Sequence, residues 1–152
     1  MTKPRLSWAI QRYARQAVVV PNGREVTGYK PGLAAATLTE HILRDRLAEQ
    51  IGGVTEANLG YGRADVLTAE LAIEVEPCGN WRHAVRQALG YAAQTGCRPA
   101  VALFGAMRRD EVLKIYLQLR DGHPPVELWW CQYGHWRRIS SRHHCKQQHN
   151  PR

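Results

Sequence analysis

Residues 63–91 read RADVLTAELAIEVEPCGNWRHAVRQALGY, and this stretch decides the fold. Two short apolar segments, Ala64–Thr68 and Leu71–Val75, predict strands joined by a tight turn at Ala69-Glu70. This dipeptide lacks the glycine or asparagine that two-residue hairpin turns prefer, so a longer loop is the alternative. The stretch predicts a β-hairpin whose register depends on the length of that turn.

Three carboxylates gather on this hairpin. If the turn has two residues, Asp65 lies directly opposite Glu74, and alternation places Glu76 on the same face as Glu74. Like charges opposite each other destabilise a sheet, whereas clustered carboxylates suit Mg²⁺ or Mn²⁺. The alternative is a solvated hairpin edge with ordinary surface acids. The strands are mostly aliphatic, however, and a helix and a further apolar strand follow, so we favour a metal site in a covered sheet.

A helix is predicted before the hairpin, from Thr37 or Thr39 to about Ile51, with Gly52-Gly53 after it. Its Glu40 is in line with the apolar stripe of the helix. A carboxylate at this position either stabilises the helix N-terminus or belongs to the site, and the spacing alone leaves both open.

A second helix is predicted after the hairpin, over about Trp81–Thr95, with a strand at Ala100–Phe104 beyond it. Gln87 and Tyr91 lie one turn apart on this helix. Without further information, Gln87 is a solvent-facing residue and Tyr91 a residue at the edge of the apolar face.

The outer segments predict further elements. We expect a short helix at Leu6–Gln16, a hairpin formed by Ala17–Val20 and Glu25–Tyr29, and a strand at Leu113–Leu119, where apolar residues alternate with polar ones. The aromatic residues 129–136 predict a terminal strand pair.

The order of these residues resembles the core of the PD-(D/E)xK nuclease superfamily, in its RecB-type branch, and the motif consists of Asp65, Glu74-x-Glu76 and Gln87-x-x-x-Tyr91. The resemblance covers Thr39 to about Phe104. It implies an α/β fold with a restriction-endonuclease-like mixed central sheet flanked by helices, in the core order αβββαβ.

The resemblance also implies roles for individual residues. Mg²⁺ or Mn²⁺ would be held by the carboxylates of Asp65, Glu74 and Glu76 and by the backbone carbonyl of Val75. Gln87 would orient a carboxylate or the scissile strand with support from Tyr91, and Glu40 would join the metal shell. Glu76 stands where the superfamily usually has lysine, so Arg82 or Arg86 is a candidate for the missing positive charge.

The charge distribution favours a polyanionic partner. The chain has 152 residues, a net charge of +8 and a pI near 9.7, and no acidic residue precedes Glu25 or follows Glu127. Basic flanks around an acidic centre suit phosphate binding. The expected nucleic-acid-binding residues are Arg63, Arg82, Arg86, Arg137, Arg138 and Arg142. A basic protein with solvated tails is the alternative.

Length and hydropathy predict one domain, with a basic extension over residues 1–33, a nuclease-like core over 34–120 and an aromatic and basic extension over 121–152. No apolar run is long enough for a bilayer and no signal peptide is evident, so we expect a cytoplasmic protein without a membrane partner. A homodimer is an open alternative to a monomer.

Three hypotheses about function follow from these features. The first is a Mg²⁺-dependent deoxyribonuclease, endo- or exonucleolytic, that hydrolyses phosphodiester bonds. The second is a catalytically inactive nuclease-fold protein that binds nucleic acid or regulates a partner. The third is a zinc-dependent binding module, disfavoured by irregular ligand spacing, whose candidate ligands are Cys131, His135, His143, His144, Cys145 and His149.

Overall fold

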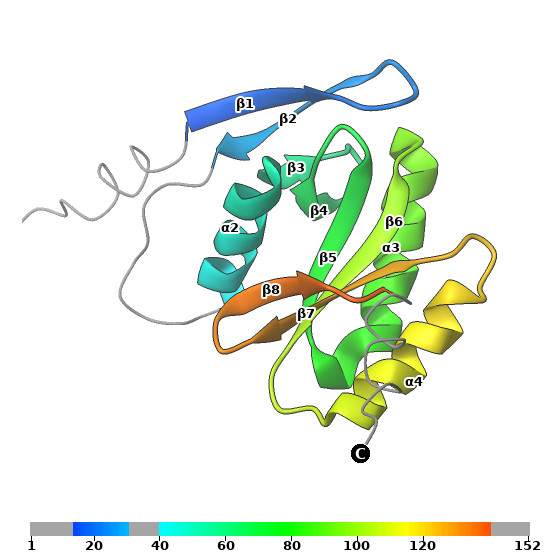
Figure 1. The fold of residues 1–152 in the computed structure, drawn as a ribbon. Helices are drawn as coiled ribbons and strands as arrows, with labels where there is room; N and C mark the ends of the chain where they lie inside the picture. The colour runs from blue at the N-terminus through cyan, green and yellow to red at the C-terminus, as the bar shows by residue number, and fades with distance from the viewer. Residues whose placement is uncertain (1–13, 31–39, 141–152) are drawn as a thin grey trace, which may run out of the picture.

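The computed structural model describes residues 14–30 and 40–140, which contain one mixed sheet and the helices that cover it (Figure 1). The sheet has eight strands in the spatial order of the sequence. They are β1 (Ala14–Val19), β2 (Glu25–Lys30), β3 (Val54–Asn58), β4 (Arg63–Leu67), β5 (Leu71–Pro77), β6 (Arg98–Phe104), β7 (Glu127–Gln132) and β8 (His135–Arg138). The helices are α2 (Glu40–Ile51), α3 (Trp81–Thr95) and α4 (Arg109–Arg120), with a short 3₁₀ turn, η1 (Cys78–Asn80), before α3.

The mode of strand pairing changes twice along the sheet. Strands β1 to β5 pair antiparallel, β5, β6 and β7 pair parallel, and β8 returns antiparallel to β7. Helix α3 makes the crossover between β5 and β6, as parallel pairing requires. The predicted α/β class with a mixed, helix-flanked sheet is therefore confirmed, and the elements from α2 to β6 follow in the order αβββαβ.

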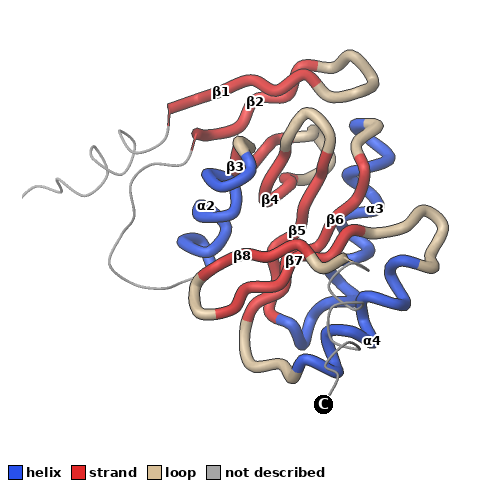
Figure 2. Tube along the Cα trace, in the orientation of Figure 1, coloured by secondary structure: helices blue, strands red, loops and turns tan. Residues whose placement is uncertain are grey.

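The helices cover opposite faces of the sheet (Figure 2). On one face, Leu43 and Leu47 of α2 pack in a cluster that includes Ile73 and Val75 of β5. On the other face, apolar residues of α3 and α4 pack against β6 and β7. Because both faces of β5 are covered, Leu71–Val75 is buried throughout.

The β4–β5 hairpin has the predicted two-residue turn. The Thr68 amide donates to the Leu71 carbonyl at 2.9 Å, which leaves only Ala69-Glu70 between them. The Thr68 hydroxyl oxygen also accepts hydrogen bonds from the amides of Glu70 and Leu71, at 3.1 and 2.9 Å. A threonine side chain thus stabilises a turn that lacks glycine or asparagine.

Two predicted elements differ from the structure. The strand predicted at Leu113–Leu119 is wrong, because these residues lie in α4. Val112, Ile115 and Leu119 are buried at helical spacing, and Leu117, which completed the alternation, is 43% exposed. The helix predicted at Leu6–Gln16 lies largely outside the described residues, and its last three positions belong to β1.

The outer hairpins extend the same sheet. The predicted hairpin of β1 and β2 is confirmed, as is the terminal strand pair of β7 and β8. Gly28 allows β2 to approach β3, because a Cβ there would lie 2.6 Å from Val54 Cγ2 and 2.8 Å from the Thr55 carbonyl oxygen. No helix in the described part of the chain is long and apolar enough to cross a bilayer.

Candidate functional site

Three acidic residues occupy one level of the sheet on adjacent strands. The β3–β4 partners Thr55–Val66 and Ala57–Ala64 flank the position where Glu56 faces Asp65. The β4–β5 partners Leu67–Ala72 and Val66–Ile73 lead to the next position, where Asp65 faces Glu74. The predicted opposition of Asp65 and Glu74 is therefore confirmed.

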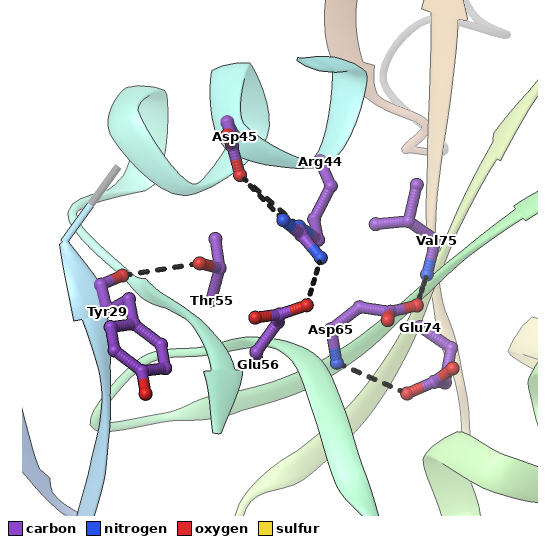
Figure 3. A network of polar contacts seen from close by, with 8 residues as sticks. All are labelled: Tyr29, Arg44, Asp45, Thr55, Glu56, Asp65, Glu74 and Val75. Carbon is purple, nitrogen blue, oxygen red and sulfur yellow. Dashed lines mark hydrogen bonds and ion pairs between the residues drawn. The ribbon is translucent and has the colours of Figure 1, made fainter. Parts of the chain in front are cut away.

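Asp65 and Glu74 hydrogen-bond to each other's strands (Figure 3). Asp65 Oδ2 accepts from the Val75 amide at 2.9 Å, and Glu74 Oε1 accepts from the Asp65 amide at 3.3 Å. Regular pairing between β4 and β5 ends at Val66–Ile73, so carboxylates take over bonds that a continuous ladder would give to carbonyls. The acids thus sit in a fork between the strands.

Burial changes the protonation of this pair. Glu74 is only 3% exposed, and its pKa rises to about 9, first because of desolvation and then because of the charge of Asp65. Desolvation also raises the pKa of Asp65, opposed by its hydrogen bond from the Val75 amide. Without a cation, Glu74 therefore holds a proton at neutral pH.

Glu40 and Glu76 complete an acidic cluster around this fork. Burial raises the pKa of Glu40, and the charges of Glu76 and Asp65 raise it further. Glu76 is half-buried at the end of β5, and its charge also contributes to the raised pKa of Glu74. The structure therefore brings together the four acidic side chains that the sequence singled out, from α2, β4 and β5.

Arg44 is the buried cation beside the cluster, and sequence reasoning did not identify it. Its guanidinium, on a residue 6% exposed, donates to Asp45 Oδ1 and to Glu56 Oε1, each at 3.2 Å (Figure 3). Its charge lowers the pKa of both Asp65 and Glu40. The sequence did contain a signal for Arg44. It lies four residues after Glu40 on the apolar face of the helix, where a buried arginine needs acidic partners.

Glu56 adopts a backbone conformation that few non-glycine residues take. Its φ is 47°, in the left-handed region. The regular β3–β4 pairs continue on both sides of it, and its side chain meets Arg44 on α2. Glu56 lies opposite Asp65 in the sheet, and its left-handed backbone allows its side chain to reach Arg44 on α2.

Tyr91 lies next to the acidic pair. Desolvation raises its pKa, and the charges of Glu74 and Asp65 raise it further, against a hydrogen bond from the Arg63 amide. Gln87 is half-buried one turn earlier on α3, and no hydrogen bond joins it to these carboxylates within the described residues.

The predicted nucleic-acid-binding arginines are dispersed. Arg63 is exposed two residues before Asp65, and alternation gives these side chains the same face. Arg82 stacks over the Trp81 ring at 4.5 Å, and Arg86 is exposed on α3. The remaining candidates are more distant or undescribed: Arg137 and Arg138 are on β8, beyond β6 and β7 from β5, and Arg142 lies outside the described residues.

The carboxylate oxygens of this cluster are the type of ligand that a hard cation prefers, but their positions in the structure do not form a coordination site. Within residues 14–30 and 40–140, no three His, Cys, Asp or Glu side chains form a group that could hold a metal ion as they stand. The donors are nevertheless oxygen atoms, the type that Mg²⁺ and Mn²⁺ prefer. The buried pair also carries excess negative charge, while the hydrogen bonds of Arg44 go to other acids. The residues therefore fit a divalent cation once Glu74 has lost its proton.

Most of the candidate zinc ligands cannot be placed. Cys131 on β7 and His135 on β8 are described, and the register pairs them with Trp136 and Gln132 respectively rather than with each other. The other members of that set, His143, His144, Cys145 and His149, lie outside the described residues.

No family model, curated protein or solved structure matches this chain.

Proposed function

We propose that the protein is a metal-dependent nuclease that hydrolyses phosphodiester bonds in DNA. The observation that carries this proposal is the fork at Asp65 and Glu74, where two acids share a buried position with Glu40 and Glu76 close by. Such an arrangement costs folding free energy, because desolvated like charges repel each other. Oxygen-rich sites of this kind serve divalent cations in phosphoryl chemistry.

The roles of the residues follow from their positions. Asp65 and Glu74 would hold Mg²⁺, with the Val75 carbonyl and Glu76 as further oxygen donors. The bound cation would polarise the phosphate and lower the pKa of a nucleophilic water. Glu76 is also a candidate general base, since it is the least enclosed acid on β5. Glu40 lies close enough to influence a second cation or the outer shell.

Substrate binding would depend on the basic surface. The net charge of +8 favours nucleic acid, and Arg63 lies on the strand that carries Asp65. Tyr91, on α3, would limit the space beside the acidic pair and help to position the substrate strand. Gln87 remains a candidate for contact with that strand from one turn earlier on α3.

A non-catalytic nucleic-acid-binding function is the second candidate, and one observation favours it. Glu76 occupies the position where the resemblance expects lysine, and the nearby buried cation, Arg44, is hydrogen-bonded to Asp45 and Glu56. Without that lysine, and with Arg44 bound to other acids, the site has less means of stabilising the negative charge that develops at phosphorus.

The decisive experiment is a cleavage assay on single-stranded, duplex, flap and junction DNA with Mg²⁺ or Mn²⁺. We expect wild-type cleavage to require metal, and Asp65→Asn and Glu74→Gln to abolish it while remaining folded. Glu70→Gln, which changes an exposed carboxylate in the β4–β5 turn, is the matched control and should cleave normally. A wild type that binds DNA tightly without metal and cuts none of these forms would establish the binding function instead.

A further inference from the structure

Tyr61 is displayed to solvent at the tip of the β3–β4 hairpin. It is 92% exposed, an unusual position for a large aromatic side chain. Gly60 and Gly62 flank it with φ values of 89° and 139°, conformations that favour glycine. The two glycines therefore allow the backbone to turn on both sides of Tyr61.

The hairpin tip is held firmly. The Leu59 amide donates to the Gly62 carbonyl at 2.9 Å, and the Gly60 amide donates to Asn58 Oδ1 at 2.9 Å. Arg24 reaches from the β1–β2 hairpin to donate to the Leu59 carbonyl at 3.1 Å. Leu59 itself is 1% exposed and anchors the tip in the core. Tyr61 is thus an aromatic ring on a fixed support, which lowers the entropic cost of binding through it.

The same hairpin leads directly into the acidic fork. A Cβ on Gly62 would lie 3.0 Å from the hydroxyl oxygen of Tyr91, whose pKa responds to Glu74 and Asp65. Asp65 follows Tyr61 by four residues, a path of at most about 13 Å along an extended strand. The exposed Arg63 lies between them, and Arg24 supports the tip, so positive charge accompanies the ring.

We propose that Tyr61 is a stacking platform for an unpaired base of the nucleic-acid strand whose backbone reaches the Asp65–Glu74 fork. This inference rests on the proposed function and specifies its substrate class. An exposed aromatic ring on a held hairpin tip, beside arginines, is the arrangement by which proteins hold single-stranded nucleic acid with little sequence preference. Bases inside a duplex are already stacked on their neighbours, so the substrate must offer a single-stranded segment, a flap or a frayed end.

Tyr133 provides an internal control. It is 98% exposed at the β7–β8 turn, on strands separated from β4 by β5 and β6. It therefore has the same side chain and nearly the same exposure as Tyr61, on a turn that does not lead into the strand carrying Asp65.

The test measures binding of a fluorescent oligonucleotide in EDTA, so that no metal-dependent cleavage occurs. For a single strand, we expect Tyr61→Ala to weaken binding about 5- to 150-fold, the range for loss of one base–aromatic stack. Tyr61→Phe should retain wild-type affinity, because the ring does the stacking. Tyr133→Ala should bind as wild type, and Tyr61→Ala should leave the affinity for a blunt duplex unchanged.

Several results would overturn the inference. These are wild-type affinity of Tyr61→Ala for the single strand, an equal loss on the duplex, an equal loss in Tyr133→Ala, or no single-strand binding by the wild type. Failure of the proposed function is distinguishable, because it is scored by metal-dependent cleavage. If the protein never cuts DNA but depends on Tyr61 for single-strand binding, the inference about Tyr61 stands and the proposed nuclease function is wrong.

Discussion

Asp65 and Glu74 each accept a hydrogen bond from a backbone amide of the opposite strand, at 2.9 and 3.3 Å. These bonds orient both carboxyl groups into the fork between β4 and β5, and burial of Glu74 keeps it protonated at neutral pH when no cation is bound. A divalent cation and that proton would compete for the same oxygen atoms. Protonation, stability and metal binding are therefore linked at this site.

The first prediction concerns the pH dependence of stability without metal. The pKa of Glu74 is about 9 in the folded protein and near 4.5 when unfolded, so the folded state binds more protons between these values. Stability should be greatest at low pH within this window and fall as pH rises toward 9, by at most ~1.4 kcal/mol per pH unit for one proton. The raised pKa values of Asp65 and Glu40 act in the same direction.

Denaturant unfolding in EDTA between pH 5 and 9 checks this expectation. Glu74→Gln should flatten the profile, because the amide cannot ionise, whereas Glu70→Gln should keep the wild-type slope. Saturating Mg²⁺ should remove or reverse the fall, since the cation stabilises the deprotonated pair. Wild-type stability that rises steadily toward pH 9 in EDTA would mean that Glu74 is ionised in the folded protein.

The second prediction concerns Arg44. Arg44→Met removes a cation that is 6% exposed and hydrogen-bonded to Asp45 and Glu56. We expect a loss of about 2–4 kcal/mol of stability, below the usual cost of breaking a fully buried pair, because the Glu56 side chain is 41% exposed. Loss of the positive charge should also raise the pKa of Asp65 further.

Urea unfolding of Arg44→Met and of Arg46→Met measures this difference. Arg46 is exposed on the same helix, so its variant should change stability by less than about 0.5 kcal/mol. Equal stabilities of the two variants would show that Arg44 does not hold α2 and β3 together.

Local rules predicted the hairpin and α3 well, because they depend on short-range geometry. The length of the turn at Ala69-Glu70 fixes which residues face each other, so the Asp65–Glu74 opposition followed from numbering alone. Helix α3 has its predicted bounds, Trp81–Thr95, because Gly96 takes the left-handed conformation, with φ 77°, that ends a helix.

The remaining features depend on contacts between distant segments. Residues Leu113–Leu119 fit both strand and helix periods, and the choice rests on packing of α4 against β7 and on exposure of Leu117. The ion pair of Arg44 with Glu56 joins α2 to β3, and the left-handed backbone of Glu56 has no signature in the sequence. An arginine in a buried helical stripe signals that a partner exists without identifying it.

The third prediction contrasts two glycines. Gly28→Ala should destabilise the fold by about 1–3 kcal/mol, because the new Cβ would lie 2.8 Å from the Thr55 carbonyl oxygen, at the contact of β2 with β3. Gly90→Ala on α3 should stabilise the protein by about 0.5–1 kcal/mol, because nothing lies within 4 Å of its Cβ and alanine favours a helix. Thermal unfolding gives both signs, and stabilisation by Gly28→Ala would contradict the close approach of these strands.

The last prediction concerns Glu76, which stands where the resemblance expects lysine. Its negative charge contributes to the raised pKa values of Glu74 and Glu40. Glu76→Lys should therefore lower both pKa values and raise stability in EDTA at pH 8, because a cation would then face the acidic pair. It should also lower the concentration of Mg²⁺ or Mn²⁺ needed for cleavage, or create cleavage if the wild type has none, by supplying charge opposite the developing phosphorane.

Metal titrations of cleavage for the wild type, Glu76→Lys and Glu76→Gln separate the possible roles of this residue. If Glu76 holds a second cation, Glu76→Gln should require more metal than the wild type, whereas Glu76→Lys should require less because its ammonium replaces that second cation. If Glu76 is instead the general base, both variants should lose rate at saturating metal. Loss of cleavage in Glu76→Lys, with the expected gain of stability in EDTA, would show that cleavage depends on the glutamate itself.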